Sequence, residues 1–577
     1  MNYFNLIFNI LPKKQKSKIY KVLIINFISV ILEILSIGLI IPFLIFITGQ
    51  KNIFLKIEHF SFLNEIDDNK LIIYTIILLV IIFTIKNLYL SISLRYNSKY
   101  IYNSVRDLSN YIFYNYLKKP FTFFMSVNSS ILIRNVIQDV NNFGISILFS
   151  TINLVVEFFI IFGLSIILII YNPQIYFLVT IPGLLFVFLI YNILKSRLQK
   201  WGDISHKYTA KKLKNTKQGI EGIKEIIINQ AQEKFFSIFS KDNQLFVTSD
   251  IKRWIYLNFP RFLIEVFMVY AFASIIFFMY FMNFDNNSII STLGLFAAVA
   301  FRLTPSFLRI TNSLNLIKFH KPILLNLDNE IKSLKQDNVI IKNTDIIYNF
   351  DNKIEIQNLF FKYNQPYKEI FQNSNFEIFK GDKIGIYGAS GSGKSTFVDL
   401  VTGLNLPASG DIKVDGISIY ESITNWQRLI GYVSQKTYII DGSIKSNITF
   451  ELENTVKDNS KIIEILKIVE LYDFVNTLKN NIDEQIGENG IKLSGGQIQR
   501  LSLARALYRN PKILIMDEST NALDSVTEEK ILNNLSKSNL FETLIFITHK
   551  INSLKFCNKI FELKDRNFHV KNYEEKF

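Results

Sequence analysis

The most informative stretch of the chain is Lys383-Ile-Gly-Ile-Tyr-Gly-Ala-Ser-Gly-Ser-Gly-Lys-Ser-Thr396. Its first five residues form an apolar run that is typical of a buried strand, and the glycine-rich part that follows has the pattern G-x-x-x-x-G-K-S. Glycines let the backbone curl so that its N–H groups face bound phosphates, at the positive end of the next helix. The stretch therefore predicts a strand, a phosphate-binding loop and a helix, and with them an α/β domain.

The side chains of this loop predict a site for a nucleotide and Mg²⁺. Lys394 is placed to reach the β- and γ-phosphates, and the hydroxyl of Ser395 is placed to hold the metal ion. We expect ATP and Mg²⁺ as cofactors, with the whole loop in contact with the nucleotide. The predicted contacts are Gly388, Ala389, Ser390, Gly391, Ser392, Gly393, Lys394, Ser395 and Thr396.

A second motif, Ile513-Leu-Ile-Met-Asp517-Glu518, is an apolar strand that ends in two carboxylates. Asp517 suits Mg²⁺ and Glu518 suits the polarisation of an attacking water, because phosphoryl transfer depends mainly on positioning and charge stabilisation. If this motif stood alone, the simpler interpretation would be a structural one, an acidic strand end beside a helix cap. A third motif, which lies between the first two in the sequence, favours the catalytic interpretation.

That third motif is Leu493-Ser-Gly-Gly-Gln-Ile-Gln-Arg500, which resembles the signature of the ATP-binding cassette (ABC) family. The resemblance implies a homodimer, in which the signature of one copy closes over ATP bound to the phosphate loop of the other. It also implies two equivalent ATP sites, because each chain carries one cassette. The signature residues concerned are Ser494, Gly495, Gly496 and Gln497.

Further positions match the pattern of the family. The resemblance implies that Tyr363 stacks on adenine, that Gln435 contacts Mg²⁺ and the attacking water, and that His549 lies near the γ-phosphate. Asn521 stands where serine is more usual, which bears on communication between the two sites more than on hydrolysis. The predicted catalytic residues are therefore Glu518, His549 and Gln435, and the predicted metal-binding residues are Ser395, Gln435 and Asp517.

Six apolar stretches precede the cassette, and each is long enough to cross a bilayer, which takes about 20 residues. Buried core helices of a soluble protein are the alternative, but such helices rarely reach this length without polar interruption. The stretches are 22–48, 71–94, 151–171, 174–194, 255–284 and 288–318. The order of membrane part and cassette, with long cytoplasmic connections, resembles the exporter branch of the family.

Basic residues predict the orientation of the spans. They gather before the first span and in the connections at 95–150 and 195–254, whereas the turns at 172–173 and 285–287 have almost no charge. Both termini and the ATPase domain are thus expected in the cytoplasm. Much of the net charge of +15 is then a topology signal, and we expect no nucleic-acid partner.

These patterns predict the fold class and the domains. We expect a membrane α-helical domain with six transmembrane helices over 1–320, a linker over 321–350, and a cytosolic α/β P-loop ATPase domain of the ABC type over 351–577. Residues 1–11 are expected to form a helix in the membrane interface rather than a secretory signal. A single cysteine, Cys557, excludes a disulfide framework and a multi-cysteine zinc site.

Cations within the spans suggest what is transported, since ionisable residues in a membrane usually face a polar cavity or a partner. Counted from the outer end of each span at a rise of about 1.5 Å per residue, the four cations named below lie in the cytoplasmic half of the membrane. We expect a belt for the phosphate of a lipid head group. Simpler alternatives are an intrahelical pair of Arg261 with Glu265 and solvation or snorkelling of the others. The predicted substrate-contacting residues are Arg302, Arg309, Lys86 and Arg261.

The stretch Phe301-Arg-Leu-Thr-Pro-Ser-Phe-Leu-Arg-Ile-Thr-Asn312 resembles the sixth span of PglK-type flippases. Segment 51–69 is expected to form either the short helix that such flippases place on their outer side or a plain amphipathic loop. The resemblance implies an ATP-driven flippase for undecaprenyl-diphosphate-linked oligosaccharide in a bacterial inner membrane, with membrane lipid and a lipid-linked glycan as partners. An exporter of lipid A-like lipids, drugs or peptides is the alternative within the class. An ATP-gated channel is the alternative from another class, and intact Glu518 argues against it.

Overall fold

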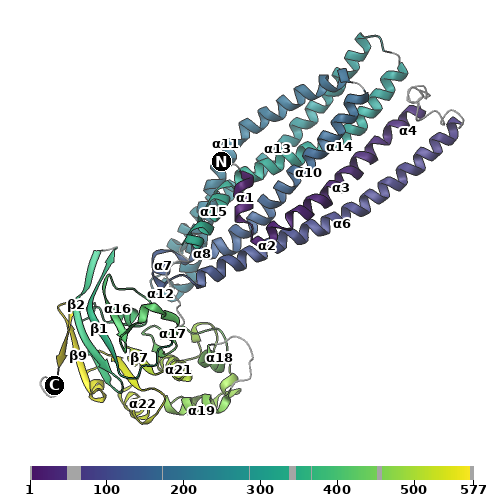
Figure 1. The fold of residues 1–577 in the computed structure, drawn as a ribbon. Helices are drawn as coiled ribbons and strands as arrows, with labels where there is room; N and C mark the ends of the chain where they lie inside the picture. The colour runs from purple at the N-terminus through teal and green to yellow at the C-terminus, as the bar shows by residue number, and fades with distance from the viewer. Residues whose placement is uncertain are drawn as a thin grey trace. The chain divides into compact units, whose positions relative to one another are not determined.

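The computed structural model describes residues 3–47, 67–171, 173–284, 286–336, 346–364, 367–450 and 458–571 (Figure 1). The chain divides into two compact units. The first runs from Met1 to Asp337 apart from residues 120–123, and the second comprises those four residues and Asn338–Phe577. Most of the outer helix expected within 51–69 lies outside the described residues.

The N-terminal unit is helical. Its helices are α1 (Tyr3–Ile10), α2 (Lys13–Lys16), α3 (Ile19–Gly38), α4 (Ile40–Ile47), α6 (Asp68–Leu117), α7 (Phe121–Ser126), α8 (Ser129–Arg134), η2 (Asn135–Asp139), α9 (Val140–Asn142), η3 (Phe143–Leu148), α10 (Phe149–Tyr171), α11 (Pro173–Glu221), α12 (Ile223–Ile228), α13 (Gln232–Phe281), α14 (Asn286–Phe319) and α15 (Lys321–Gln336). Six described helical stretches are long and apolar enough to cross a membrane, which confirms the six predicted spans.

Three of these helices extend far beyond a bilayer. Helices α6 and α13 have 50 residues each and α11 has 49. At a rise of about 1.5 Å per residue each is about 75 Å long, against a hydrocarbon layer of about 30 Å. Their polar halves are the connections that the sequence predicts to continue as helices below the membrane.

Close helix packing forms the core of this unit. Val30 and Ile37 of α3 pack with Ile160 and Leu164 of α10. A Cβ atom at Gly163 would lie 2.1 Å from Cδ1 of Ile34, so a larger residue here would require the side chain of Ile34 to move. This packing matters because α3 and α10 also carry acidic side chains toward α14.

The N-terminal helix α1 buries Leu6, Ile7 and Ile10, and it packs against α15. Phe4 and Phe8 on its other face are exposed. An apolar face left outside the unit is compatible with the interfacial helix that the sequence predicts.

The C-terminal unit contains two sheets and their helices. The strands are β1 (Lys353–Asn364), β2 (Tyr367–Phe379), β3 (Lys383–Tyr387), β4 (Ser409–Val414), β5 (Ile417–Ser418), β6 (Ile430–Val433), β7 (Ile513–Asp517), β8 (Thr543–Ile547), β9 (Lys559–Lys564) and β10 (Asn567–Lys571). The helices are α16 (Lys394–Val401), η4 (Ile419–Glu421), α17 (Ile423–Gln427), α18 (Ile444–Thr449), α19 (Asn459–Ile468), α20 (Tyr472–Thr477), η5 (Asn481–Asp483), η6 (Glu488–Gly490), α21 (Gly495–Tyr508), α22 (Ser525–Lys537) and η7 (Ile551–Phe556).

The larger sheet has the order β10-β9-β3-β8-β7-β6, and its strands from β9 to β6 pair in parallel. Every residue of β7 and of β8 is buried, as expected for apolar strands covered on both faces. The smaller sheet, β2-β1-β4-β5, is antiparallel. The fold predicted from the sequence, six apolar helices followed by an α/β domain, is confirmed.

The boundary between the two units falls within the segment 321–350, which the sequence predicts to be a linker. Helix α15 forms its first part and belongs to the N-terminal unit. Tyr348 and Phe350, near its end, are buried in the core of the C-terminal unit. The described part of this segment is thus packed against one unit or the other.

Candidate active site

The functional side chains of the C-terminal unit lie along one edge of the larger sheet. In a parallel sheet the carboxyl ends of neighbouring strands meet at the same edge, which is where α/β proteins bind ligands. Strand β3 ends at the phosphate loop, β7 ends at Asp517, and β6 and β8 lead into Gln435 and His549. Motifs that are far apart in the sequence therefore converge.

The phosphate loop has the backbone that its glycines permit. Gly391 and Gly393 have φ angles of +77° and +113°, in the left-handed region that favours glycine. The ammonium of Lys394 donates to the carbonyl oxygens of Gly388 and Ala389 at 2.9 and 3.0 Å. Burial lowers the pKa of Lys394, whereas the charges of Glu518 and Asp517 act in the opposite direction. The side chain of Lys394 thus lies against the phosphate loop, where it is expected to contact bound phosphates.

Ser395 and Asp517 are two of the three residues predicted to hold the metal ion, and the third, Gln435, donates a hydrogen bond to Glu518. Burial raises the pKa of Asp517 to about 6, the charge of Glu518 adds to the rise, and a hydrogen bond from Ser395 opposes it. One carboxylate oxygen of Asp517, Oδ1, is buried and has no hydrogen-bond partner. A hydroxyl beside a buried carboxylate with an unused oxygen is the donor set that Mg²⁺ prefers, so these residues fit the cation.

Glu518 is the centre of the predicted catalytic group. Its Oε2 accepts a hydrogen bond from Nε2 of Gln435 at 2.7 Å, and its Oε1 lies 2.7 Å from Nε2 of His549. The backbone of Glu518 has a φ of +48°, and its N–H donates to the carbonyl of Ile547. The structure thus brings together all three residues that the sequence predicts to be catalytic. Strained backbone of this kind is typical of functional sites.

Asn521 is a third partner of this carboxylate. Its Nδ2 donates to Oε2 of Glu518 at 3.3 Å. The sequence identifies Asn521 only as a departure from the usual serine. The structure shows that its side chain contacts the predicted catalytic carboxylate in the same chain, a contact that no motif indicated.

The predicted adenine and signature residues lie in two places. The hydroxyl of Tyr363 is 3.2 Å from Oγ1 of Thr396, so this ring lies beside the phosphate loop. Ser494 and Gln497 form a capping box at the start of α21. A Cβ atom at Gly496 would lie 3.1 Å from the carbonyl oxygen of Ala522. Among the described residues, the signature glycines thus lie against segment 521–524 of the same chain rather than against the phosphate loop.

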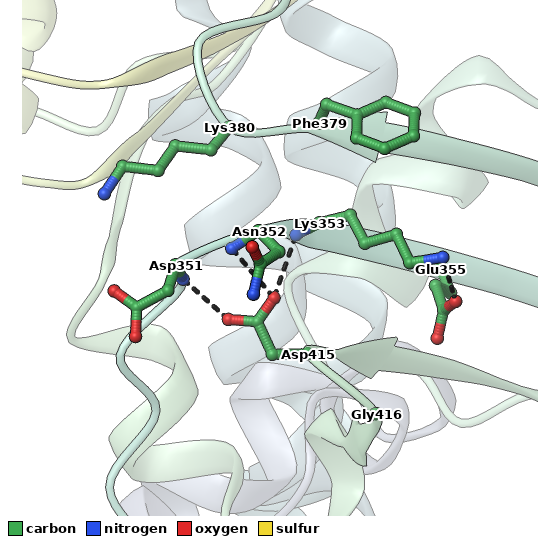
Figure 2. Close-up of a pocket in the computed structure, with 8 residues that line it drawn as sticks. All are labelled: Asp351, Asn352, Lys353, Glu355, Phe379, Lys380, Asp415 and Gly416. Atoms are coloured by element: carbon green, nitrogen blue, oxygen red, sulfur yellow. Dashed lines mark hydrogen bonds and ion pairs between the residues drawn. The ribbon is translucent and has the colours of Figure 1, made fainter.

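A hollow lies beside strands of the smaller sheet (Figure 2). It is lined by Asp351, Asn352, Lys353, Glu355, Phe379, Lys380, Asp415 and Gly416. The carboxylate of Asp415 accepts three backbone N–H bonds, and Lys353 pairs with Glu355 at 2.6 Å. Its lining contains none of the predicted nucleotide contacts and many of its charges are already paired, so it is not the candidate site.

The cations predicted to contact substrate are distributed unevenly. Nε of Arg302 donates to Oε1 of Glu33 at 2.5 Å, and Arg309 pairs with Glu157. Lys86 interacts electrostatically with Glu33 and Arg302. We call Glu33, Lys86, Glu157, Arg302 and Arg309 the charge cluster.

Arg261 has a different environment. Among the contacts of the described residues, its ion pair is with Glu265, four residues along the same helix, and both side chains are more than half exposed. The intrahelical pair is thus the alternative that the structure shows for this cation, while the other three predicted cations gather in the charge cluster.

Sequence reasoning missed the two carboxylates of the charge cluster. Glu33 and Glu157 lie in the first and third apolar stretches, and both are buried. The signal that would have identified them is the one applied to the cations, an ionisable residue within a span. Only the basic residues within the spans were considered as candidates, and the acidic residues were not.

Known proteins resemble this chain in two ways. Residues 371–521 match the family described as ABC transporter. The alpha-hemolysin translocation ATP-binding protein HlyB of Escherichia coli O157:H7 is 40% identical over 208 residues, 36% of this chain and 29% of that protein. The leukotoxin translocation ATP-binding protein LktB of Mannheimia glucosida is 38% identical over 208 residues, again 36% of this chain and 29% of that protein. The matches thus span less than a third of these relatives.

A solved structure extends the likeness to nearly the whole chain. The structure of a bacterial Atm1-family ABC exporter with ATP bound superposes with a TM-score of 0.75 at 17% identity, and the match covers 96% of each chain. At this identity the likeness shows the fold. The C-terminal unit is therefore an ABC transporter ATPase domain, homologous to those of HlyB-type exporters, in a chain with the fold of an ABC exporter.

Proposed function

We propose that this protein is an ABC exporter that couples ATP hydrolysis to transport across a membrane. The observation that carries the proposal is the convergence of Gln435, Glu518 and His549 beside the phosphate loop. Six apolar helices in the same chain supply the membrane part.

The geometry supports a role for each residue of the active site. Glu518 orients the attacking water and accepts its proton, with its carboxylate held by Gln435 and His549. Lys394 exchanges the carbonyls of its own loop for phosphate oxygens. Ser395 and Asp517 would hold Mg²⁺. When bound, MgATP supplies the phosphoanhydride bond whose cleavage resets the transporter.

The position of the signature supports the proposal of a homodimer. Since Ser494 and its neighbours contact segment 521–524 of their own chain, the phosphate loop needs a signature from elsewhere. A second copy would supply it, and two copies would form two equivalent ATP sites. The distribution of basic residues supports a cytoplasmic location of the ATPase domain. The proposal of a bacterial inner membrane rests on the resemblance of the sixth span to that of PglK-type flippases.

For the substrate we propose a phosphate-bearing lipid, specifically an undecaprenyl-diphosphate-linked oligosaccharide moved to the outer leaflet. The charge cluster supports this class, because two arginines and a lysine converge within the apolar helices. Arginine matches phosphate through paired N–H donors. The names of the relatives above concern toxin translocation, but the similarity to them is confined to about a third of this chain.

The test is ATP hydrolysis by the purified homodimer in lipid bilayers, with and without undecaprenyl-diphosphate oligosaccharide. We expect basal hydrolysis that Glu518→Gln removes, and stimulation by the lipid that Arg302→Ala removes. Basal hydrolysis indifferent to this lipid would refute the substrate and leave the exporter. Steady ion conductance without turnover would instead support a channel.

A further inference from the structure

The charge cluster lies among four helices of the N-terminal unit. Glu33 comes from α3, Lys86 from α6, Glu157 from α10, and Arg302 and Arg309 from α14. The side chains of Arg302, Glu33 and Glu157 are 14%, 11% and 6% exposed. Ionisable groups placed this way in apolar helices are costly and usually functional.

Carboxylates already occupy the arginines in this conformation. Glu33 accepts from Nε of Arg302, and Glu157 lies between the two arginines, paired with Arg309 and 3.7 Å from Nη1 of Arg302. Three cations against two carboxylates leave one net positive charge when all are ionised. A phosphate that enters must therefore compete with the carboxylates of the protein itself.

The pairing is incomplete. Oε2 of Glu157 is buried without a hydrogen-bond partner, so this carboxylate is only partly satisfied. Arg302 uses Nε toward Glu33 and Nη1 toward Ser306, at 2.6 Å. A guanidinium has five N–H donors, and the side chain of Arg309 is 44% exposed in the single chain. The arginines thus keep donors for another anion, and one of them is accessible.

We propose that Glu33 and Glu157 are internal counter-anions of the transport site, which hold Arg302 and Arg309 in this conformation and give them up to the phosphate groups of the transported molecule. The inference rests on the proposed phosphate-bearing substrate. It adds that the two glutamates set the affinity of the site for phosphate by competing for the same donors.

The competing explanation is that these ion pairs only join helices. The two explanations predict opposite effects of neutralising a carboxylate. If the glutamates compete with phosphate, their removal strengthens phosphate binding, because net positive charge rises and arginine donors become free. If they only position the arginines, their removal weakens it.

The test measures binding of farnesyl diphosphate to the full-length homodimer in nanodiscs, with farnesol as the matched probe that lacks phosphate. Glu157→Gln keeps the size of the side chain and removes its charge, and we expect it to lower the dissociation constant for farnesyl diphosphate about fivefold or more. Glu33→Gln should act in the same direction, and Arg302→Gln should raise the dissociation constant about tenfold. Glu265→Gln, in the exposed pair with Arg261, is the control and should leave it within about twofold.

Each outcome decides the proposal. Weaker or unchanged binding in Glu157→Gln and Glu33→Gln, with binding lost in Arg302→Gln, would overturn the counter-anion role and keep the phosphate site. Wild-type binding of farnesyl diphosphate no tighter than that of farnesol, also when both glutamates are replaced, would overturn the phosphate-bearing substrate and the counter-anions together. ATP hydrolysis through Glu518 is tested separately and would be untouched. If Glu157→Gln does not fold, the dissociation constant of Glu33→Gln alone tests the counter-anion role.

Discussion

Two groups of charged side chains in this protein were assembled in different ways. The group around Glu518 comes from strand ends at one edge of a parallel sheet, where the topology alone brings Gln435 and His549 together. The charge cluster comes from four helices whose relative rotation decides which side chains meet. The first arrangement can be read from motifs, whereas the second depends on how the helices pack.

The strongest test of the first group is Glu518→Gln. The change keeps the shape of the side chain and removes the carboxylate that we propose as the acceptor of the proton, so we expect ATP hydrolysis to fall about 100-fold or more. Nucleotide binding should persist, since Lys394 and the loop glycines are unchanged. Steady-state hydrolysis and nucleotide binding by the same preparation measure both effects. Exposed Glu529, replaced by Gln, is the control; a Glu518→Gln enzyme with more than a tenth of the normal rate would contradict the role.

For the second group, Arg302→Ala should cost stability rather than nucleotide binding. It leaves Glu33 and Glu157 buried near each other with fewer partners, and removal of one member of a buried ion pair costs about 3 kcal/mol. Heating the purified protein and following loss of folded homodimer measures the effect. Arg302→Lys should recover part of the loss. Unchanged thermal stability in Arg302→Ala would mean that the pair is not formed in the folded protein.

His320 is a buried titratable residue that belongs neither to the group around Glu518 nor to the charge cluster. Burial lowers the pKa of this imidazole to about 3, and the charges of Arg253 and His206 add to the effect. Its pKa in the unfolded chain is about 6.5. Because the folded protein binds this proton more weakly than the unfolded chain, stability is complete above about pH 6.5 and falls as the pH drops below it.

The expected loss from this histidine is about 1 kcal/mol between pH 6.5 and 5.5. His320→Gln should remove that part of the pH dependence while other groups keep theirs. Thermal unfolding of both proteins at a series of pH values measures the difference. Parallel curves for the two proteins would show that His320 does not remain neutral in the folded state.

The smallest effect is expected at the pair Arg261–Glu265. Both side chains are more than half exposed, and an i,i+4 pair of this kind contributes about 0.5 kcal/mol or less. Glu265→Gln should therefore leave thermal stability and ATP hydrolysis nearly unchanged. A loss as large as that of Arg302→Ala would place Arg261 with the charge cluster after all, as the sequence analysis expects.

The sequence was sufficient for the architecture and for most of the ATP site. Apolar length predicts the six helices, because a bilayer demands that length. The phosphate loop, Asp517 and Glu518 follow apolar strands directly, so their place at a strand end is local information. The contact of Asn521 with Glu518 was not predictable in this way, since it depends on how the segment after β7 turns back.

What only the tertiary structure decided is the partner of each charge within the membrane part. Hydropathy shows that Arg302 and Glu33 lie in spans, but the two residues are 269 positions apart. Their contact depends on helix packing, including the close approach of α10 to α3 at Gly163. A side chain pairs with whatever the neighbouring helix presents at its depth and rotation, and periodicity along one helix does not contain that information. The local strand-to-loop connections were therefore predictable, and the ion pairs between helices were not.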